Sequence, residues 1–296
     1  MTYGFHEQIQ KAQVLVEAMP YLQEFRGKTF VIKIGGSVMD DWPIIEGLVR
    51  DVVFFSLMGI DAVLVHGGGK AISRAMSEAG LGARFINGFR ITDEATVEIV
   101  ERTLRLEINP RLVQAAIEFG GKAVGVNGRD VFLGRKRGPI VDASTGEPAD
   151  LGWVGEVVDF HLEEIQAALT RDAIPVVSPI ASEIGTQHAL NCNADVAAGA
   201  LAGRLGAAKF IYLSDVLGVM NDPRDPKTLF THLDEKQARR LIAEGTITAG
   251  MIPKVESALS ALAAGARKVH MIDARLPHSL LLEIFTKEGI GTEIVR

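Results

Sequence analysis

Apolar runs and helical patterns of apolar residues alternate along most of this chain. In the first half, two such units each place a glycine turn between a β-rich run and a helical pattern. Continuous apolar strands of this kind are typical of a parallel sheet with helices on both faces. The predicted elements are strands at 29–34 and 61–65, glycine turns at Gly35-Gly36 and Gly67-Gly68-Gly69, and helices at 43–58 and about 70–79.

The same alternation continues through the second half. No Ser/Gly linker or low-complexity segment interrupts it, so the pattern predicts two lobes that share one sheet, at 27–185 and 186–296. The predicted strands are 155–160, 174–180, 209–214, 268–272 and 293–295, and the predicted helices are 162–171, 194–205, 234–245, 250–264 and 279–287.

The segment from Phe85 to Arg137 has a different sequence pattern. Asn87-Gly88 is a hairpin-turn dipeptide, Asp93 is a suitable N-cap for a helix that runs to about Ile108, and Asn127-Gly128 predicts a second hairpin. We therefore expect a hairpin-rich insert beside the sheet.

Residues 1–26 precede the first strand and contain apolar residues at roughly helical spacing from Phe5 to Met19. They predict an appended amphipathic helix over about 5–25. Such a helix can fold back on its own domain or serve as an arm that packs on another subunit, and the pattern leaves both alternatives open.

Composition narrows the class of protein. Hydrophobic residues make up 47% of the chain and charged residues 23%, which is ordinary for a folded globular protein, and the net charge is −6. This balance predicts no strongly basic surface that would bind nucleic acid or an anionic membrane. Cys192 is the only cysteine, and no apolar run approaches the ~20 residues that span a bilayer. The N-terminus has no signal-peptide pattern, so we expect a cytoplasmic protein with small-molecule partners.

Three common site motifs are absent. A Walker A loop around Gly69-Lys70 would need a glycine and a hydroxyl residue where Leu64 and Ala71 stand. The dinucleotide-binding template fails because Ile72 occupies the third glycine position. The seven histidines never fall in a metal-ligand spacing, so we expect no protein metal site.

Lys33 and the two glycine turns are the first candidates for a site. Lys33 ends an apolar strand, where a lysine costs desolvation unless an anion meets it, although it could also reach solvent. Gly35-Gly36 and Gly67-Gly68-Gly69 each precede a helix, where unpaired N–H groups and the helix dipole favour phosphate. Tight turns also use glycine for steric reasons, but two turns flanking a lysine favour a phosphate site.

Polar residues later in the chain extend this site. Arg90 follows the Asn87-Gly88 turn and could bind a carboxylate through both terminal nitrogens. Three polar side chains among residues 191–195 exceed what one helix cap requires. Lys254 lies early in a helix, against the dipole preference, which is consistent with a lysine that faces a phosphate.

Six motifs in this order resemble the amino-acid kinase family. They are Lys33-Ile-Gly-Gly-Ser37, His66-Gly-Gly-Gly69, Asn87-Gly-Phe-Arg90-Ile-Thr92, Asn191-Cys-Asn-Ala-Asp195, Leu213-Ser-Asp-Val-Leu-Gly-Val219 and Gly250-Met-Ile-Pro-Lys254. The resemblance covers the chain from about Lys28 onward. It implies an open αβα sandwich around a mainly parallel sheet, with the acceptor on the first lobe and ATP on the second.

The resemblance also implies roles for individual residues. Lys33 and Lys254 match the lysines that stabilise the transition state, and Asp195 matches the aspartate that orients them. The acceptor would contact Gly68, Gly69, Arg90, Asn191 and Asn193. ATP, with Mg²⁺ bridging its phosphates, would contact Gly35, Gly36, Ser214, Asp215, Gly218, Val219, Thr246 and Thr248.

Within the family, the match is closest to the members that phosphorylate the side-chain carboxylate of N-acetyl-L-glutamate. The N-terminal helix and residues 284–292 resemble the arginine-inhibited members, which form hexamers as trimers of dimers; the matching effector positions are His270, Glu283 and Gly289. A kinase for carrier-bound aminoadipate or glutamate, aspartate, glutamate or UMP is an alternative. A non-catalytic amino-acid sensor of the same fold is another.

Overall fold

A mainly parallel sheet forms the centre of the molecule in the computed structural model, which describes residues 5–247 and 251–296. Eight strands of the described chain build it, and β16 and the neighbouring β14 run antiparallel to the rest. In spatial order they are β14 (His232–Asp234), β16 (Thr292–Val295), β15 (Val269–Asp273), β13 (Lys209–Ser214), β1 (Thr29–Ile34), β2 (Asp61–His66), β10 (Ile174–Val177) and β5 (Ala123–Val126).

Helices cover both faces of this sheet, and two apolar clusters fill the space between them. Strand residues alternate between the clusters, so that Ile32 faces one and Val31 the other. The first face carries α2 (Trp42–Leu57), α4 (Glu94–Thr103), α5 (Asn109–Glu118) and α10 (Ser279–Phe285), with α3 (Gly69–Glu78) beside them; the second carries α6 (Glu163–Leu169), α7 (Ala194–Arg204), α8 (Glu235–Ala243) and α9 (Ile252–Ala264). The predicted αβα sandwich is confirmed.

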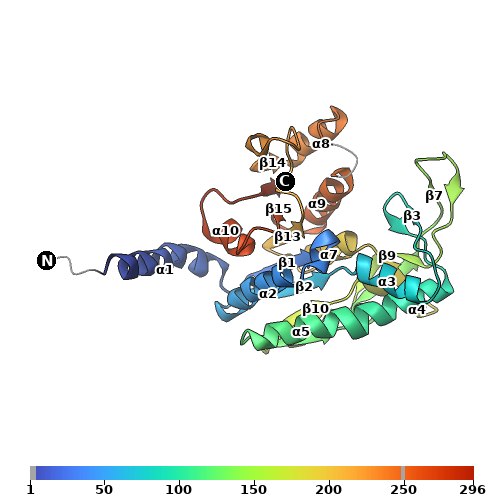
Figure 1. Ribbon diagram of the computed structural model, residues 1–296, viewed down its shortest axis with the longest axis horizontal. Helices are drawn as coiled ribbons and strands as arrows, with labels where there is room; N and C mark the ends of the chain where they lie inside the picture. The colour runs from blue at the N-terminus through green and yellow to red at the C-terminus, as the bar shows by residue number, and fades with distance from the viewer. Residues whose placement is uncertain (1–4, 248–250) are drawn as a thin grey trace.

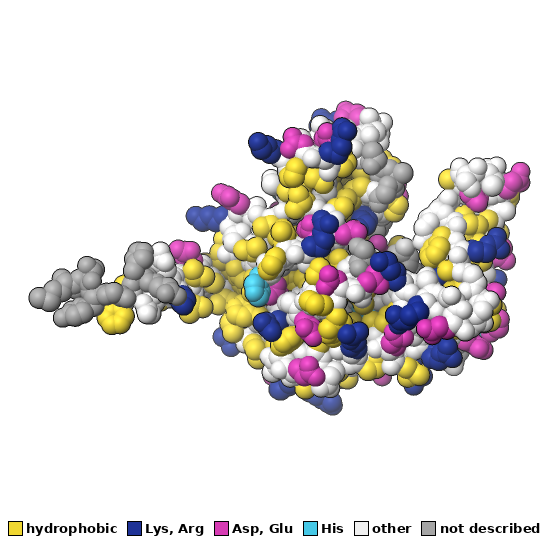
Figure 2. Space-filling model, in the orientation of Figure 1, with side chains coloured by type: hydrophobic (Ala, Val, Ile, Leu, Met, Phe, Trp, Pro, Cys, Tyr) yellow, Lys and Arg dark blue, Asp and Glu magenta, His cyan; other side chains and the backbone are white. Residues whose placement is uncertain are grey.

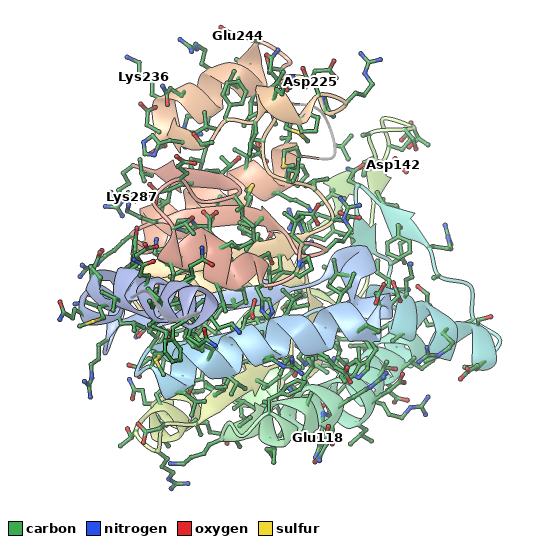
Figure 3. The ribbon with its side chains drawn as sticks, turned by 60° about the vertical axis from the view of Figure 1, so that its left-hand side comes forward. Glu118, Asp142, Asp225, Lys236, Glu244 and Lys287 are labelled. Atoms are coloured by element: carbon green, nitrogen blue, oxygen red, sulfur yellow. The ribbon has the colours of Figure 1, made fainter. Side chains whose placement is uncertain are left out.

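Both halves of the chain contribute to the one sheet. Strands β1, β2, β5 and β10 belong to the first half, and β13 to β16 belong to the second. Figure 1 shows the second half above the first, and in Figure 3 Lys236 and Glu244 lie at the opposite end of the molecule from Glu118 of α5. The two halves of the chain thus meet within one sheet, where β1 pairs with β13.

A small closed sheet and two hairpins stand beside the main sheet. The small sheet contains β11 (Ile180–Glu183), β12 (Ala189–Cys192), β9 (Val154–Phe160) and β6 (Phe132–Lys136). The hairpins are β3 (Phe85–Ile86) with β4 (Phe89–Arg90), and β7 (Ile140–Val141) with β8 (Pro148–Ala149). Asn87 and Gly88 have φ of 48° and 82°, so the predicted turn between β3 and β4 is confirmed.

Two predictions about the insert were wrong. The helix capped by Asp93 does not end at Ile108, because a π-helical turn, η2 (Leu104–Ile108), leads directly into α5. Pro110 then occupies the first turn of α5, where its missing N–H is not needed. Asn127-Gly128 forms no hairpin but opens the 3₁₀ turn η3 (Gly128–Asp130) between strands of different sheets.

The remaining differences concern strand membership. The strand expected at 155–160 is β9 of the small sheet, and the strand expected at 174–180 is two strands, β10 and β11, that belong to different sheets. Pro179, which cannot donate to a ladder, lies at the break between them. The pattern also missed β7, β8, β12 and β14, which are short.

Helix α1 (His6–Phe25) leaves the body of the molecule and points away from it (Figure 1). Only its C-terminal end packs on the fold. There Phe25 enters the core, and the Tyr21 ring lies edge-on to the Phe285 ring, with the ring centroids 6.2 Å apart. Leu15 and Val16 are more than 60% exposed. The helix is therefore not folded back on its own domain.

The other regular segments are the short 3₁₀ turns η1 (Gly36–Asp40) and η4 (Pro226–Thr228). In the part of the chain that the structure describes, every helix is too short or too polar to cross a lipid bilayer.

Candidate active site

Lys33 lies at the C-terminal end of β1, and its side chain is almost fully buried. Its Nζ is 2.6 Å from Asp195 Oδ1, so the buried charge has an opposite partner. The ammonium also lies directly over Gly35, where a Cβ would collide with Nζ. Glycine at this position therefore makes room for the lysine.

Asp195 lies in the first turn of α7, and Asn193 fixes the start of that helix. Asn193 Oδ1 accepts hydrogen bonds from the main-chain N–H groups of Asp195 and Val196 at 2.8 and 3.2 Å. Asn193 is thus an N-cap, although it also lines the cavity described next. The cap directs the Asp195 carboxylate toward Lys33.

Lys254 lies in the first turn of α9, and the charges of Asp195, Lys33 and Asp215 act on it. Burial lowers the pKa of Lys254, and Lys33 lowers it further while the two carboxylates oppose the shift. Two lysines and an aspartate are thus gathered between the C-terminal ends of β1 and β13.

A cavity of about 310 Å³ opens on the first-half side of this cluster. Lys33, Asp195, Arg90 and Asn191 supply its polar walls, and the Gly67–Gly69 turn supplies main-chain groups. Its other lining residues are Gly36, Ile72, Phe85, Gly88, Phe89, Leu104, Val154, Pro179, Cys192, Asn193 and Ala194. The hairpin β3–β4 forms one side, and its apolar members Phe85 and Phe89 were not predicted.

Arg90 is buried and its terminal nitrogens already have protein partners. Nη2 donates to Gly69 O at 2.8 Å and to Ser73 Oγ at 2.9 Å, and the guanidinium lies over the Phe85 ring at 4.6 Å. Burial lowers the pKa of Arg90. The arginine therefore ties hairpin β3–β4 to α3, while a contact with a ligand carboxylate stays a prediction.

Asn191 is connected to the same hairpin through Thr92. Asn191 Nδ2 donates to Thr92 Oγ1 at 3.0 Å, and Thr92 Oγ1 donates to Arg90 O at 2.8 Å. Neighbouring Cys192 is buried, and burial raises the pKa of its thiol to about 12. It is a buried cysteine whose thiol stays protonated at neutral pH.

His66 supports the second glycine turn from beneath. Its Nδ1–H donates to Gly67 O at 3.0 Å, and its Nε2 accepts from Asn109 Nδ2 at 3.2 Å. Because the ring is fully buried, its pKa is lowered to about 4, and it is neutral at pH 7. His66 therefore shapes the turn and carries no charge there.

A second cavity, of about 280 Å³, lies on the other side of Lys254. Four of the predicted nucleotide residues line it: Asp215, Gly218, Val219 and Thr246. Ser214 does not line it but precedes the loop, and Thr248 lies outside the described residues. Val216 and Ile247, which lie within the two predicted stretches, line it as well, whereas Met220, Pro223 and Met251 were not predicted.

A wide notch between the second half and the two hairpins is visible on the molecular surface in Figure 2. Gly36 of the first glycine pair has φ of 71° and lines the first cavity. Gly35 and Gly36 therefore lie beside Lys33, at the edge of the first cavity. Among the described residues, no three His, Cys, Asp or Glu side chains converge as metal ligands.

The predicted effector residues form a separate cluster on the far side of the sheet. His270 Nδ1–H donates to Glu283 Oε1 at 2.6 Å, and Lys209 Nζ donates to His270 Nε2 at 3.0 Å. Glu283 Oε2 accepts from the N–H groups of Ile290 and Gly291, and a Cβ on Gly289 would lie 2.9 Å from it. The three residues are brought together, but nothing in this geometry identifies a ligand.

The arrangement suits the transfer of a charged group between two bound anions. Two lysines supply positive charge at one point, and one cavity opens on each side of them. Positive charge at such a point can offset negative charge that develops between the anions. The buried His66 is neutral and lines neither cavity.

Comparison with known proteins gives this geometry a context. The model of the amino acid kinase family matches residues 28–273. An acetylglutamate kinase of Akkermansia muciniphila is 53% identical over 288 residues, which are 97% of this chain and 96% of the relative. An acetylglutamate kinase of Methanocaldococcus jannaschii is 45% identical over 295 residues, 98% of each chain.

A solved structure shows the same architecture. The N-acetylglutamate synthase from Neisseria gonorrhoeae, complexed with coenzyme A and N-acetyl-glutamate, superposes with a TM-score of 0.83 at 25% identity. The match covers 96% of this chain but only 63% of the synthase. The two chains therefore share the described fold, and the synthase has a further portion without a counterpart here.

Proposed function

This chain belongs to the amino acid kinase family, and we propose that it transfers the γ-phosphoryl group of ATP to the side-chain carboxylate of N-acetyl-L-glutamate. A carboxylate oxygen forms a bond to the γ-phosphorus while the bond from that phosphorus to the bridging oxygen of ADP breaks. The products are N-acetyl-L-glutamyl 5-phosphate and ADP. Relatives that match nearly the full length and are named acetylglutamate kinase support the choice of acceptor.

The observation that carries the proposal is the ion pair between the buried Lys33 and the partly exposed Asp195 in the wall of the first cavity, with Lys254 in the wall of the second. Bringing a carboxylate to a γ-phosphate joins two anions, so the main task is to offset negative charge in the transition state. In the proposed mechanism Lys33 and Lys254 do this, and Asp195 holds Lys33 in place. A carboxylate nucleophile is already ionised and needs no general base.

We assign the acceptor to the first cavity. Its volume of about 310 Å³ suits a small acyl amino acid, and the N–H groups at Gly68 and Gly69 can approach an anion there. In this assignment Arg90 and Asn191 keep hairpin β3–β4 against the acceptor, and Asn193 orders the adjacent wall.

We assign ATP to the second cavity, along the loop from Ser214 to Val219 and near Thr246. Gly35 and Gly36 would then lie beside its phosphates, close to Lys33. The phosphate oxygens would hold Mg²⁺, since the described residues provide no cluster of three ligands. When bound, Mg²⁺ offsets phosphate charge.

A side-by-side acceptor assay tests the proposal. ADP release from ATP is measured with N-acetyl-L-glutamate, L-glutamate, L-aspartate and UMP at equal concentrations. The expected result is turnover at least tenfold faster with N-acetyl-L-glutamate than with any other acceptor. No preference for it would overturn the assigned acceptor and leave the family assignment standing.

We further propose that arginine inhibits the enzyme by binding beside His270, Glu283 and Gly289. Glu283 and Glu293 supply carboxylates near one another, and the Lys209 ammonium lies 5.2 Å from the ring of Phe25 at the end of α1. A cationic ligand here would contact the second lobe and the base of the arm. Glu283→Gln is expected to raise the arginine concentration for half inhibition at least tenfold; an unchanged value would contradict the site.

The proposed assembly is a hexamer, a trimer of dimers joined through α1. The exposed apolar residues of α1 support it, as does a cavity of about 700 Å³ that Met19 and Leu22 line where the arm meets the body. We also propose a cytoplasmic location, because the reaction consumes ATP.

A further inference from the structure

A buried pair of hydroxyl groups lies directly behind the lysine cluster. Tyr212 Oη donates to Ser257 Oγ at 2.7 Å, and Ser257 Oγ donates to the main-chain oxygen of Asp195 at 3.3 Å. Tyr212 Oη is itself 3.4 Å from that oxygen. Neither side chain lines either cavity, so neither can contact a bound substrate there.

These two residues connect α9 and α7, which carry Lys254 and Asp195, to β13, the strand that pairs with the Lys33 strand. Tyr212 pairs in register with Lys33 across β13 and β1, so their side chains leave the sheet on the same face. Ser257 lies one helical turn after Lys254 on α9. The oxygen that accepts from Ser257 belongs to Asp195 itself.

The space around the hydroxyl pair leaves little room for another arrangement. A Cβ on Gly199 of α7 would lie 3.4 Å from Ser257 Oγ, and the Phe210 ring lies against that of Tyr212 with centroids 4.3 Å apart. Burial also raises the pKa of Tyr212 well above its usual value, so its phenol stays protonated and donates.

A phenylalanine and an alanine would fill most of the same volume without any polar group to satisfy. Hydroxyls in a buried helix contact add direction, because a hydrogen bond has a preferred distance and angle that apolar packing lacks. Here that direction sets where α9 lies along the first turn of α7.

We propose that Tyr212 and Ser257 are positioning residues that hold Lys254 against Asp195 and Lys33 during phosphoryl transfer. The inference rests on the function proposed above. Loss of either hydroxyl lets the start of α9 shift, and a displacement of ~1 Å in a catalytic group can cost up to ~100-fold in rate. The substrate cavities keep their walls, so ground-state binding changes little.

The test compares kcat and KM for ATP and N-acetyl-L-glutamate in Tyr212→Phe, Ser257→Ala and the double variant. Each single change is expected to lower kcat about tenfold and to leave both KM values within about twofold. The double variant should be no more than about twofold slower than the slower single variant, because both changes break one connection.

Ser182→Ala is the matched control. Ser182 Oγ donates to the main-chain oxygen of Arg129 at 3.1 Å in the small sheet, away from both cavities. Its kcat is expected to stay within twofold of the unaltered enzyme, and thermal unfolding of all variants shows that each one folds.

Two results would contradict the positioning role in an active enzyme. One is an unchanged kcat in both single variants, and the other is a loss of kcat in Ser182→Ala that equals theirs. An unaltered enzyme that does not phosphorylate N-acetyl-L-glutamate would instead contradict the proposed function, and the inference would fall with it.

Discussion

Lys33 illustrates how a charge is tolerated inside an apolar strand. Its ammonium has a carboxylate partner at 2.6 Å, and a glycine beneath it leaves room for the side chain. A lone buried lysine would cost several kcal/mol, whereas Lys33 has a carboxylate partner and faces a cavity. In the proposed mechanism this position meets a substrate anion.

Replacing either lysine should slow the reaction strongly. Lys33→Ala or Lys254→Ala is expected to lower kcat by at least ~100-fold, a size typical of removing one group that stabilises transition-state charge. Steady-state ADP release at saturating substrates measures the effect. Lys236→Ala, on the exposed surface of α8, serves as the control and should leave kcat unchanged. Near-normal turnover in either lysine variant would remove that lysine from the mechanism.

The lowered pKa of His66 predicts that the protein loses stability in acid. Its pKa is about 4 when folded and about 6.5 in a model peptide, so the unfolded chain takes up a proton first as the pH falls. The contribution of His66 to the free energy of unfolding is fully present above about pH 6.5. It is lost as the pH falls from about 6.5 to about 4, and the loss is roughly 3 kcal/mol at most. Urea unfolding at pH 7.5 and pH 5 measures this loss.

His66→Gln supplies the comparison, because it keeps an acceptor that can reach Asn109 but cannot titrate. The difference in unfolding free energy between the two pH values should be smaller in the variant. An equal difference would show that His66 does not control the acid response.

Residue chemistry was predictable where a side chain broke its local pattern. Lys33 stands out in an apolar strand, and Asp195 stands out among Asn residues before a helix, so the amino-acid sequence alone singles out both. Tyr212 and Ser257 break no pattern: one is an aromatic residue in a strand and the other a small residue in a helix. Their connection depends on strand register and helix contact, which no local signal encodes.

At the scale of elements, α7 and α9 pack closely through small residues. A Cβ on Gly203 would collide with Ala264 Cβ and lie 3.0 Å from the Ala264 backbone carbon. Asp195 lies in the first turn of one helix and Lys254 in the first turn of the other. In the proposed mechanism, the packing of the two helices therefore affects the distance between these groups.

Gly203→Ala is expected to separate the two helices. We expect a destabilisation of about 1–3 kcal/mol from overpacking and a lower kcat, measured by chemical denaturation and steady-state assay. Gly47→Ala, in α2, is the control, since a Cβ there meets nothing within 4 Å. It should be neutral or should stabilise by up to about 1 kcal/mol. Equal effects of the two changes would exclude close helix packing as the cause.

Elements with strong periodicity were predictable, and those set by tertiary pairing were not. The strands 29–34 and 209–214 coincide with β1 and β13, because continuous apolar runs identify buried parallel strands. The π-helical turn at Leu104–Ile108 was missed, since it arises where the helix brings Leu104 and Ile108 against Gly68. The split between β10 and β11 was missed because residues 174–180 are mostly apolar on both sides of the break at Pro179.

At the scale of the whole molecule, one sheet contains strands from both halves of the chain, and a cavity lies on each side of the lysines. The shared sheet followed from the alternation of strands and helices, whereas the resemblance implied the two sites. The apolar pattern of α1 did not decide whether this helix packs on its own fold or projects from it. An exposed apolar helix and a packed one can have the same spacing of apolar residues.

The exposed apolar residues of α1 lead to a prediction about the assembly state. Leu15 is 68% exposed, so Leu15→Glu should weaken assembly through α1 while leaving the fold intact. Light scattering after size exclusion is expected to give a hexamer for the unaltered chain and a dimer for the variant. Val158→Glu, which charges an exposed apolar position of the small sheet, should remain hexameric.

Deletion of residues 1–18 should give the same dimer. It spares Tyr21 and Phe25, which pack on the body, whereas a deletion through residue 25 would damage the core. A hexamer in both arm variants would contradict the role of α1.

The central claim, phosphoryl transfer to a carboxylate of N-acetyl-L-glutamate, is tested most directly by trapping the product. An acyl phosphate reacts with hydroxylamine to give a hydroxamate, whereas a phosphate ester does not. The account predicts that ATP and N-acetyl-L-glutamate yield N-acetylglutamyl 5-hydroxamate in equal amounts with ADP, and that Lys33→Ala abolishes both. ADP release without hydroxamate would contradict it.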